Sequence, residues 1–166
     1  MTKKCKKVRH GILLEAKEWV ADVDLNKQLK FPSDICDTDL RPDMLIRSQE
    51  EKILILIELT SPCEENLEGR HQEKEAKYEV LAGDCRKVGW KTFVFAVEVG
   101  ARGYVSDPFI TCLRRLGIQS RSMKRITTAA SNSALRCSFW IWLRKSDMSW
   151  SSGRTEENNQ TLPNTS

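Results

Sequence analysis

The 166-residue sequence lacks the segments that would direct it to a membrane or to secretion. Its longest uncharged apolar runs, such as Ile53 to Ile57, are far shorter than the roughly 20 residues of a membrane-spanning helix. No apolar stretch of the kind found in signal peptides follows the basic N-terminus. We therefore expect an intracellular protein, located in the nucleus or the cytoplasm.

The ligand spacing of a zinc finger is also missing. The sequence contains no CxxC pair among its six cysteines, and its two histidines, His10 and His71, are isolated from one another. These spacings exclude a zinc finger. In an intracellular protein the cysteines are expected to remain reduced thiols. Gly100 and Gly103 do not form a phosphate-binding loop and are typical of a turn.

Acidic residues are scarce in two parts of the chain. Residues 1–10 contain five basic residues and no acidic one, and residues 100–154 contain ten basic and two acidic residues. Residues 11–99, in contrast, contain 12 basic and 19 acidic residues, and the whole chain has a net charge of +4. This distribution favours an anionic partner at the flanks and a cation in the middle. On charge alone, an ordinary solvated surface is the simpler interpretation.

Hydrophobic residues make up 40% of the sequence, which is enough for a folded core. We expect a basic N-terminal arm over residues 1–9, one folded domain over 10–145, and a disordered tail over 146–166, where Ser, Asn, Glu and Thr dominate.

Hydrophobic periodicity within the domain predicts an α/β fold, with a small mixed sheet flanked by helices. Residues 22–40 are polar and predict a loop or an irregular strand. The expected strands are 43–46, 53–59 and 91–99, and the expected helices are 10–20, 64–88, 107–117 (with Asp107 as its cap) and 120–145.

Two carboxylates occupy unusual places in this pattern. Asp43 lies at the start of the first predicted strand, and Glu58 lies near the end of the apolar strand ILILIELT. A buried, unpaired carboxylate is costly, and a bound cation would remove that cost. If the two strands pair as a hairpin, Asp43 and Glu58 lie side by side. Two carboxylates and a strand carbonyl suit Mg²⁺, which binds oxygen ligands, water and phosphate.

Lys74 and Lys77 follow on the next predicted helix, three residues apart and therefore on one face. A lysine beside a metal-bound phosphate stabilises the charge that develops during hydrolysis. In the alternative interpretation, Glu58 pairs with a nearby basic residue and the helix lysines are merely solvated.

These residues resemble the PD-(D/E)xK nuclease superfamily. The likeness lies in Arg41-Pro42-Asp43, in Glu58-Leu59-Thr60 and in the helix lysines. More closely, the chain resembles the restriction-like endonuclease domain at the C-terminal end of non-LTR retrotransposon reverse-transcriptase proteins. The likeness covers roughly residues 9–150, in the stretches RHGILLEA, LRPDMLI, ILIELTSPCEENLE, KEAKYEVLAGDCRKVGW, VFAVEVGARGYV and SFWIWLRKSDMSW. The sequence contains no reverse-transcriptase core.

The resemblance implies an endonuclease that nicks DNA and depends on Mg²⁺ or Mn²⁺. Asp43, Glu58 and the Leu59 carbonyl would bind the metal, and a reverse transcriptase encoded elsewhere would be a second partner. Thr60 stands where the superfamily has its lysine. The retrotransposon domains carry that lysine on the next helix, which points to Lys74 and Lys77. Of the two, Lys77 is preferred because KxxKY matches best.

Two other classes of function stay open. The chain could be a catalytically inactive DNA-binding remnant of the same fold, or a partner-binding module whose charges are ordinary surface. The intact Asp43, Glu58 and Lys77 favour the nuclease, whereas the missing reverse-transcriptase core favours the remnant. A basic cluster far from the carboxylates would favour the partner-binding module.

Several further residues are weaker candidates. Glu98 ends its strand as Glu58 does, and would line the site or form a structural ion pair. Glu15 would approach the metal from the first helix, and His10 matches an Arg-His of the family. The candidates for DNA-backbone contact are basic and have few acidic neighbours: Arg102, Arg114, Arg115, Arg121, Lys124 and Arg125. Phe139, Trp140 and Trp142 would stack on bases, although core packing is the commoner role of such residues.

Overall fold

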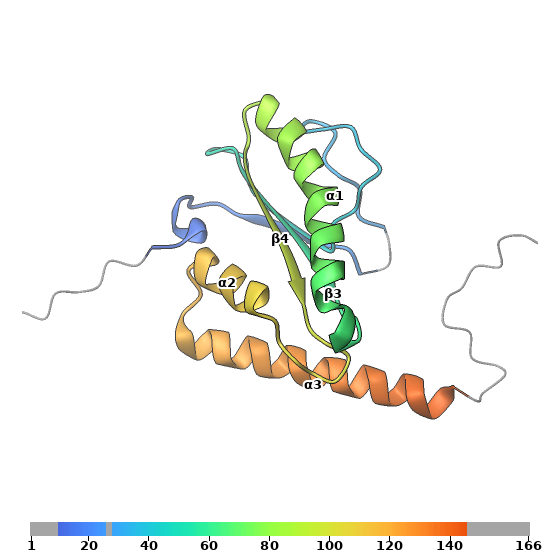
Figure 1. The fold of residues 1–166 in the computed structure, drawn as a ribbon. Coiled ribbons are helices and arrows are strands. Elements are labelled where there is room, and N and C mark those ends of the chain that lie inside the picture. The colour runs from blue at the N-terminus through green and yellow to red at the C-terminus, as the bar shows by residue number, and fades with distance from the viewer. Residues whose placement is uncertain (1–9, 26–27, 146–166) are drawn as a thin grey trace, which may run out of the picture.

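The computed structural model describes residues 10–25 and 28–145. The predicted N-terminal arm and the predicted tail, residues 1–9 and 146–166, lie outside the described residues. The described residues form an α/β fold, in which helices pack against a four-stranded mixed sheet (Figure 1). The predicted fold class is therefore confirmed.

The sheet has the order β1-β2-β3-β4. Its strands are β1 (Val20–Val23), β2 (Met44–Ser48), β3 (Ile53–Thr60) and β4 (Lys91–Glu98). Strands β1, β2 and β3 pair antiparallel, whereas β3 and β4 pair parallel. A parallel pair needs a crossover connection, and α1 (Leu67–Lys87) supplies it. The three predicted strands are thus neighbours in one sheet.

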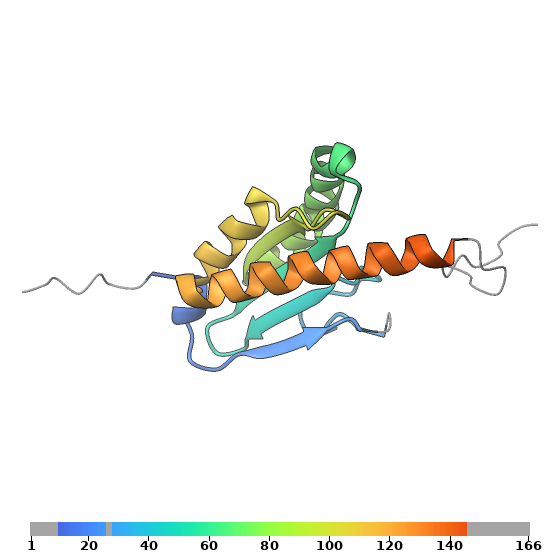
Figure 2. The ribbon, with the colours of Figure 1, turned by 90° about the horizontal axis from the view of Figure 1, so that it is seen from below.

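The other helical elements are short except for the last. They are η1 (Ile12–Leu14), η2 (Glu64–Asn66), α2 (Asp107–Leu116) and α3 (Ser120–Arg144). In both Figure 1 and Figure 2, α3 is a long straight rod whose C-terminal end extends past the rest of the described domain. No described helix is both long and apolar enough to cross a membrane.

The prediction of a helix over residues 10–20 was wrong. Only Ile12–Leu14 form a short 3-10 helix, and Val20 already begins β1. The apolar residues at helical spacing belong instead to an irregular segment. Within it, the Trp19 indole donates a hydrogen bond to the Leu13 carbonyl at 3.1 Å. Tertiary packing thus overrides the local helical pattern.

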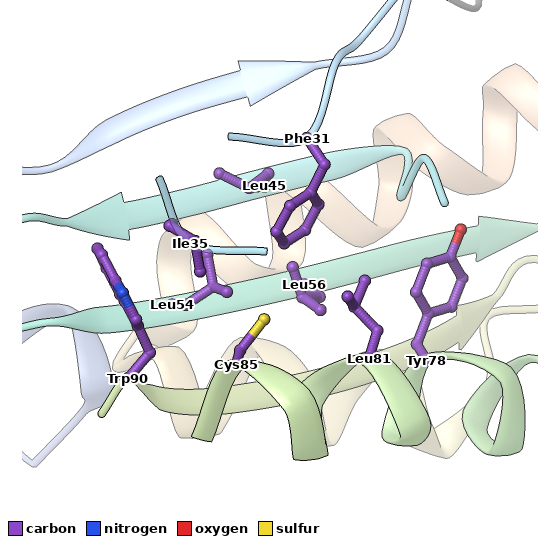
Figure 3. Packing of buried hydrophobic residues seen from close by; sticks show 9 residues of the cluster. All are labelled: Phe31, Ile35, Leu45, Leu54, Leu56, Tyr78, Leu81, Cys85 and Trp90. Carbon is purple, nitrogen blue, oxygen red and sulfur yellow. The ribbon is translucent and has the colours of Figure 1, made fainter. Parts of the chain in front are cut away.

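Alternate residues of β3 point to two different cores. Leu54 and Leu56 face α1, where they pack with a cluster that β2, the segment before it and Trp90 complete. Figure 3 shows this cluster, with Tyr78 at one end of the row and its hydroxyl directed toward the strands. The α1 core consists of Phe31, Ile35, Leu45, Leu54, Leu56, Tyr78, Leu81, Cys85 and Trp90.

The opposite face of the sheet packs against α2 and η1. Ile53 and Ile55 of β3 lie there with Phe95 and Val97 of β4, and Ile12, Cys112 and Leu116 cover them. Gly11 lies against the backbone of Gly117, where an added Cβ would meet the Gly117 Cα at 2.4 Å. This close approach of two backbones requires glycine at position 11.

Helix α2 begins at Asp107, so the residue predicted to be its cap is its first helical residue. Ser106, rather than Asp107, is the N-cap, and its hydroxyl accepts a hydrogen bond from the Phe109 N–H. Gly117 ends the helix in the left-handed conformation, with φ of 87°, as a C-terminal glycine commonly does. Ser106 is therefore placed at the carboxyl end of β4, close to Glu98.

Candidate functional site

The sheet register brings Asp43 and Glu58 together. Met44 of β2 pairs with Ile57 of β3, so the next position along the antiparallel pair places Asp43 opposite Glu58. The Leu59 N–H donates a hydrogen bond to Asp43 Oδ2 at 2.7 Å. The hairpin predicted from the sequence thus makes the two carboxylates neighbours at one edge of the sheet.

Glu58 is a buried carboxylate with only one of its oxygens paired. The residue is 7% exposed, and its Oε1 lies 2.5 Å from Lys74 Nζ. Its Oε2 is buried and has no hydrogen-bond partner in the described part of the chain, and the same holds for the Thr60 hydroxyl. A buried acceptor without a partner is rare and costly, so this oxygen requires an explanation.

Tyr78 closes the site from the α1 side. Its hydroxyl donates to the Arg41 carbonyl at 2.8 Å, which uses the only proton it has. Burial, a hydrogen-bonding contact with the Glu58 carboxylate and the nearby negative charges of Glu58 and Asp43 raise the pKa of Tyr78 far above its ordinary value. The phenol therefore stays protonated.

The pKa of Asp43 is raised above its ordinary value of 3.8, chiefly because the carboxyl is partly buried. The charges of Glu58 and Asp24 raise it further, whereas the Leu59 N–H and Lys74 lower it. Crowded carboxylates that stay ionised only at a cost are typical of a site that binds a cation.

Asp24 is a neighbour that the sequence did not reveal. The register of β1 and β2 continues past Val23 and Met44, so Asp24 lies opposite Asp43 and donates its N–H to the Asp43 carbonyl at 2.9 Å. Its own carboxylate accepts the Leu29 N–H at 3.0 Å. Strand β1 is mostly exposed, so apolar alternation gives no signal for it.

The two candidate lysines of α1 lie in different surroundings. Lys74 contacts Glu58 and is 26% exposed. Lys77 is exposed, and its ammonium lies 4.9 Å from the centre of the Tyr78 ring. The structure thus brings Lys74, and not the preferred Lys77, into contact with the carboxylate.

The residues at this edge fit a small hard cation. Mg²⁺ is commonly held by one or two carboxylates, with water and phosphate completing its coordination. Because the Thr60 carbonyl accepts the Val99 N–H on the β4 side, the Leu59 carbonyl faces the opposite side, where Asp43 lies. The described residues contain no group of three or more His, Cys, Asp or Glu side chains arranged for a metal.

Glu98 ends β4 on the same face, but both of its oxygens have partners. Oε1 lies 2.8 Å from His71 Nδ1, and Oε2 accepts from the Ser106 hydroxyl at 3.0 Å. Residue 98 pairs with Thr60 in the sheet register, one step beyond the position of Glu58. Glu98 is thus a structural carboxylate beside the candidate site, as the second of its two interpretations expected.

The basic residues do not converge on the carboxylates. Arg102 pairs with Glu65 at 3.0 Å in the loop after β4. The Arg115 guanidinium lies over the Phe93 and Phe95 rings, on the α2 face of the sheet, whereas Glu58 faces α1. The remaining members of the predicted cluster are exposed at the end of α2 and the start of α3: Arg114, Arg121, Lys124 and Arg125.

Two weaker candidates lie away from the site. Glu15 pairs with Lys91, the first residue of β4, whereas Glu58 is near the end of β3. Since β3 and β4 are parallel, these positions lie at opposite ends of the sheet, and Glu15 does not approach the predicted metal ligands. His10 is exposed beside Gly11, next to the contact with Gly117.

The aromatic residues near the end of α3 are not core residues. Phe139, Trp140 and Trp142 are 56%, 56% and 59% exposed. The interpretation of these rings as core packing is therefore wrong, and their exposure needs its own explanation.

Comparisons with known proteins found no relative of this chain. No protein-family model matches the chain, and no curated protein matches it. The function is therefore inferred from the residues themselves and from the geometry around Asp43 and Glu58.

Proposed function

We propose that the chain is a metal-dependent DNA endonuclease of retrotransposon origin, which hydrolyses a phosphodiester bond with Mg²⁺ or Mn²⁺. The observation that carries this proposal is the unpartnered, buried Oε2 of Glu58, next to Asp43 and Lys74. Sequence resemblance to restriction-like endonuclease domains supports the same chemistry. An intracellular location and a reverse transcriptase encoded elsewhere belong to this proposal.

The three predicted ligands would hold the ion at the carboxyl end of β3. Asp43 and Glu58 supply carboxylate oxygens, and the Leu59 carbonyl faces the same side. A divalent ion bound there lowers the pKa of a water molecule and neutralises charge on a phosphate.

The protein groups around the ligands have separate tasks. The Leu59 N–H fixes the orientation of Asp43, and Tyr78 shields the carboxylates from water on the α1 side. Lys74 balances the charge of Glu58 when no cation is present. With DNA bound beside Asp43 and Glu58, the Lys74 ammonium is placed to stabilise negative charge on the phosphate.

A catalytically inactive DNA-binding remnant is the second candidate. Thr60 occupies the usual lysine position of the superfamily motif, and its hydroxyl has no partner in the described chain. The basic surface of α2 and α3 lies on the other face of the sheet from Glu58. This separation is the arrangement expected of a partner-binding module, so support for the nuclease comes from the carboxylates and Lys74 and not from the basic surface.

Nicking of supercoiled plasmid separates the two candidates. We expect the parent chain to nick with Mg²⁺ or Mn²⁺ and not with EDTA, and Asp43→Ala and Glu58→Ala to lower the rate at least about a hundredfold. Metal-dependent nicking that survives both substitutions would place the chemistry elsewhere. A parent chain that binds the plasmid but never nicks it would establish the remnant.

The salt dependence of duplex binding tests the predicted basic surface. Each phosphate that is neutralised releases counterions, so binding should weaken steeply as salt is raised. Replacing Arg114, Arg115, Lys124 and Arg125 by alanine should lower affinity for all sequences alike and flatten that dependence. An unchanged slope would show that the cluster is ordinary surface.

A further inference from the structure

Helix α3 touches the rest of the domain with small side chains. Its partly buried positions recur at helical spacing and include Thr127, Ala130, Ser131 and Ala134. Near its middle, Leu135 and Ser131 lie against Gly103, in the loop after β4. No residue of α3 is fully buried. The helix therefore rests on the domain without contributing a large apolar side chain to either core.

Five large apolar side chains of α3 follow that contact and are all exposed. Residues 139–143 form the uninterrupted run Phe-Trp-Ile-Trp-Leu, in which each side chain is about half exposed. Consecutive residues of a helix point about 100° apart, so the run surrounds the helix instead of forming one stripe. Figures 1 and 2 show this end of α3 extending beyond the sheet and α1.

The same helix has only one sign of charge. Residues 120–144 contain five arginine and lysine residues and no acidic residue. Cations also lie against the aromatic rings, with the Arg144 guanidinium 5.8 Å from the centre of Trp140 and the Lys145 ammonium 5.3 Å from that of Trp142. Exposed rings beside uncompensated positive charge are complementary to a partner that has both flat bases and negative charge.

We infer that the C-terminal third of α3 is a binding surface for unpaired nucleic-acid strands, on which bases stack against Phe139, Trp140 and Trp142. Arg136, Arg144 and Lys145 attract the phosphates of the same strand. This surface goes beyond the proposed cleavage reaction, because binding of a single strand requires neither the metal ligands nor an active nuclease. Single-stranded DNA and RNA share the required chemistry.

Two other occupants fit the observations less well. A second copy that packed α3 against α3 would bring like charges together, since residues 120–144 contain no acidic residue to pair with them. A membrane-surface helix buries one apolar face and keeps the opposite face polar, whereas residues 139–143 are apolar around the whole circumference. Stacking has no such restriction, because bases can reach a ring from any side of the helix.

The test is fluorescence-anisotropy titration of the full chain with labelled oligothymidylate, oligouridylate and a duplex of equal length. The parent should bind the single strands. At matched salt, it should bind them more tightly than variants that lack the Trp140 and Trp142 rings. We expect the double variant Trp140→Leu, Trp142→Leu to weaken single-strand binding about tenfold to about a hundredfold. The corresponding Phe variant, which keeps two rings, should retain most of the affinity. Val80→Leu, at an exposed apolar position of α1, is the matched control.

Each remaining outcome would overturn the inference. Leucine variants that bind as tightly as the parent would remove stacking from the account, and so would a parent that binds no single strand. The leucine substitutions should leave the sedimentation coefficient of the protein unchanged. A parent dimer that these substitutions dissociate would assign the surface to a second copy. Binding to anionic vesicles but not to oligonucleotides would assign it to lipid. Comparing circular dichroism of all variants with the parent confirms that the exposed substitutions leave the fold intact.

Discussion

Glu58 and Glu98 occupy similar places and have opposite surroundings. Each lies at or near the carboxyl end of one of the two parallel strands, on the face toward α1, and each is buried, with 7% and 2% of its surface exposed. Glu98 has a partner for both oxygens, His71 and Ser106. Glu58 has Lys74 on one oxygen and no described partner on the other.

This difference separates a structural carboxylate from a functional candidate. Burying a charged group is costly unless hydrogen bonds and opposite charges compensate it. Glu98 is compensated within the fold, and removing it leaves its partners without their acceptor. Only one oxygen of Glu58 is compensated, by Lys74, and a bound cation would compensate the other oxygen. Burial alone therefore does not distinguish Glu58 from Glu98, whereas the unsatisfied oxygen of Glu58 makes it the candidate.

The largest effect on stability should come from the structural carboxylate. Glu98→Ala should lower the free energy of unfolding by about 3 kcal/mol, because Ser106 and His71 lose their buried partner. Glu58→Ala removes the same volume but also removes a poorly compensated charge, so its cost should stay below about 1 kcal/mol. Guanidinium denaturation in EDTA measures both. Equal losses would break the distinction between the two residues.

The lysine pair should show the next largest effect. Lys74→Ala should lower the nicking rate about a hundredfold, since the only described cation that contacts Glu58 is lost. Lys77→Ala is the matched control on the same helix and should change the rate no more than about twofold, because Lys77 is exposed over Tyr78. A larger loss of rate with Lys77→Ala than with Lys74→Ala would identify Lys77 as the charge-stabilising lysine, as the sequence motif predicted.

A smaller effect should appear in the pH dependence of the metal-free chain. The folded-state pKa of Asp43 is raised above 3.8, so the folded chain binds this proton more tightly than the unfolded chain. Its contribution to stability therefore falls as the pH rises from 3.8 through the folded-state pKa. Asp43→Asn, which can still accept the Leu59 N–H, should be more stable than the parent near neutral pH in EDTA. Parent and variant curves of the same slope would contradict this sign.

The sheet and the carboxylate pair were predictable for a physical reason. The β-branched run ILILI and the strand KTFVFAVE are continuous and apolar, as strands buried on both faces are. The short turn between Ser48 and Ile53 then fixes the register of the hairpin, and that register makes Asp43 and Glu58 neighbours. The sequence therefore contained the neighbourhood of the candidate site.

The rest of the site depends on contacts that local patterns do not encode. Lys74 and Lys77 share one helix face, so spacing could not tell which of them reaches Glu58. Strand β1 is short and exposed at the sheet edge, and Asp24 was hidden with it. The cap of α2 is Ser106 and not the predicted Asp107. Only the fold shows that the Ser106 hydroxyl also donates to Glu98.

Binding of Mn²⁺ to the purified chain tests the central claim most directly, because it requires neither DNA nor cleavage. Titration followed by electron paramagnetic resonance should show one bound ion for the parent and for Lys77→Ala, and no bound ion for Glu58→Gln, with all three folded by circular dichroism. Competition by Mg²⁺ should release the ion. A parent that binds no Mn²⁺, or a Glu58→Gln variant that binds it as tightly as the parent, would contradict the account.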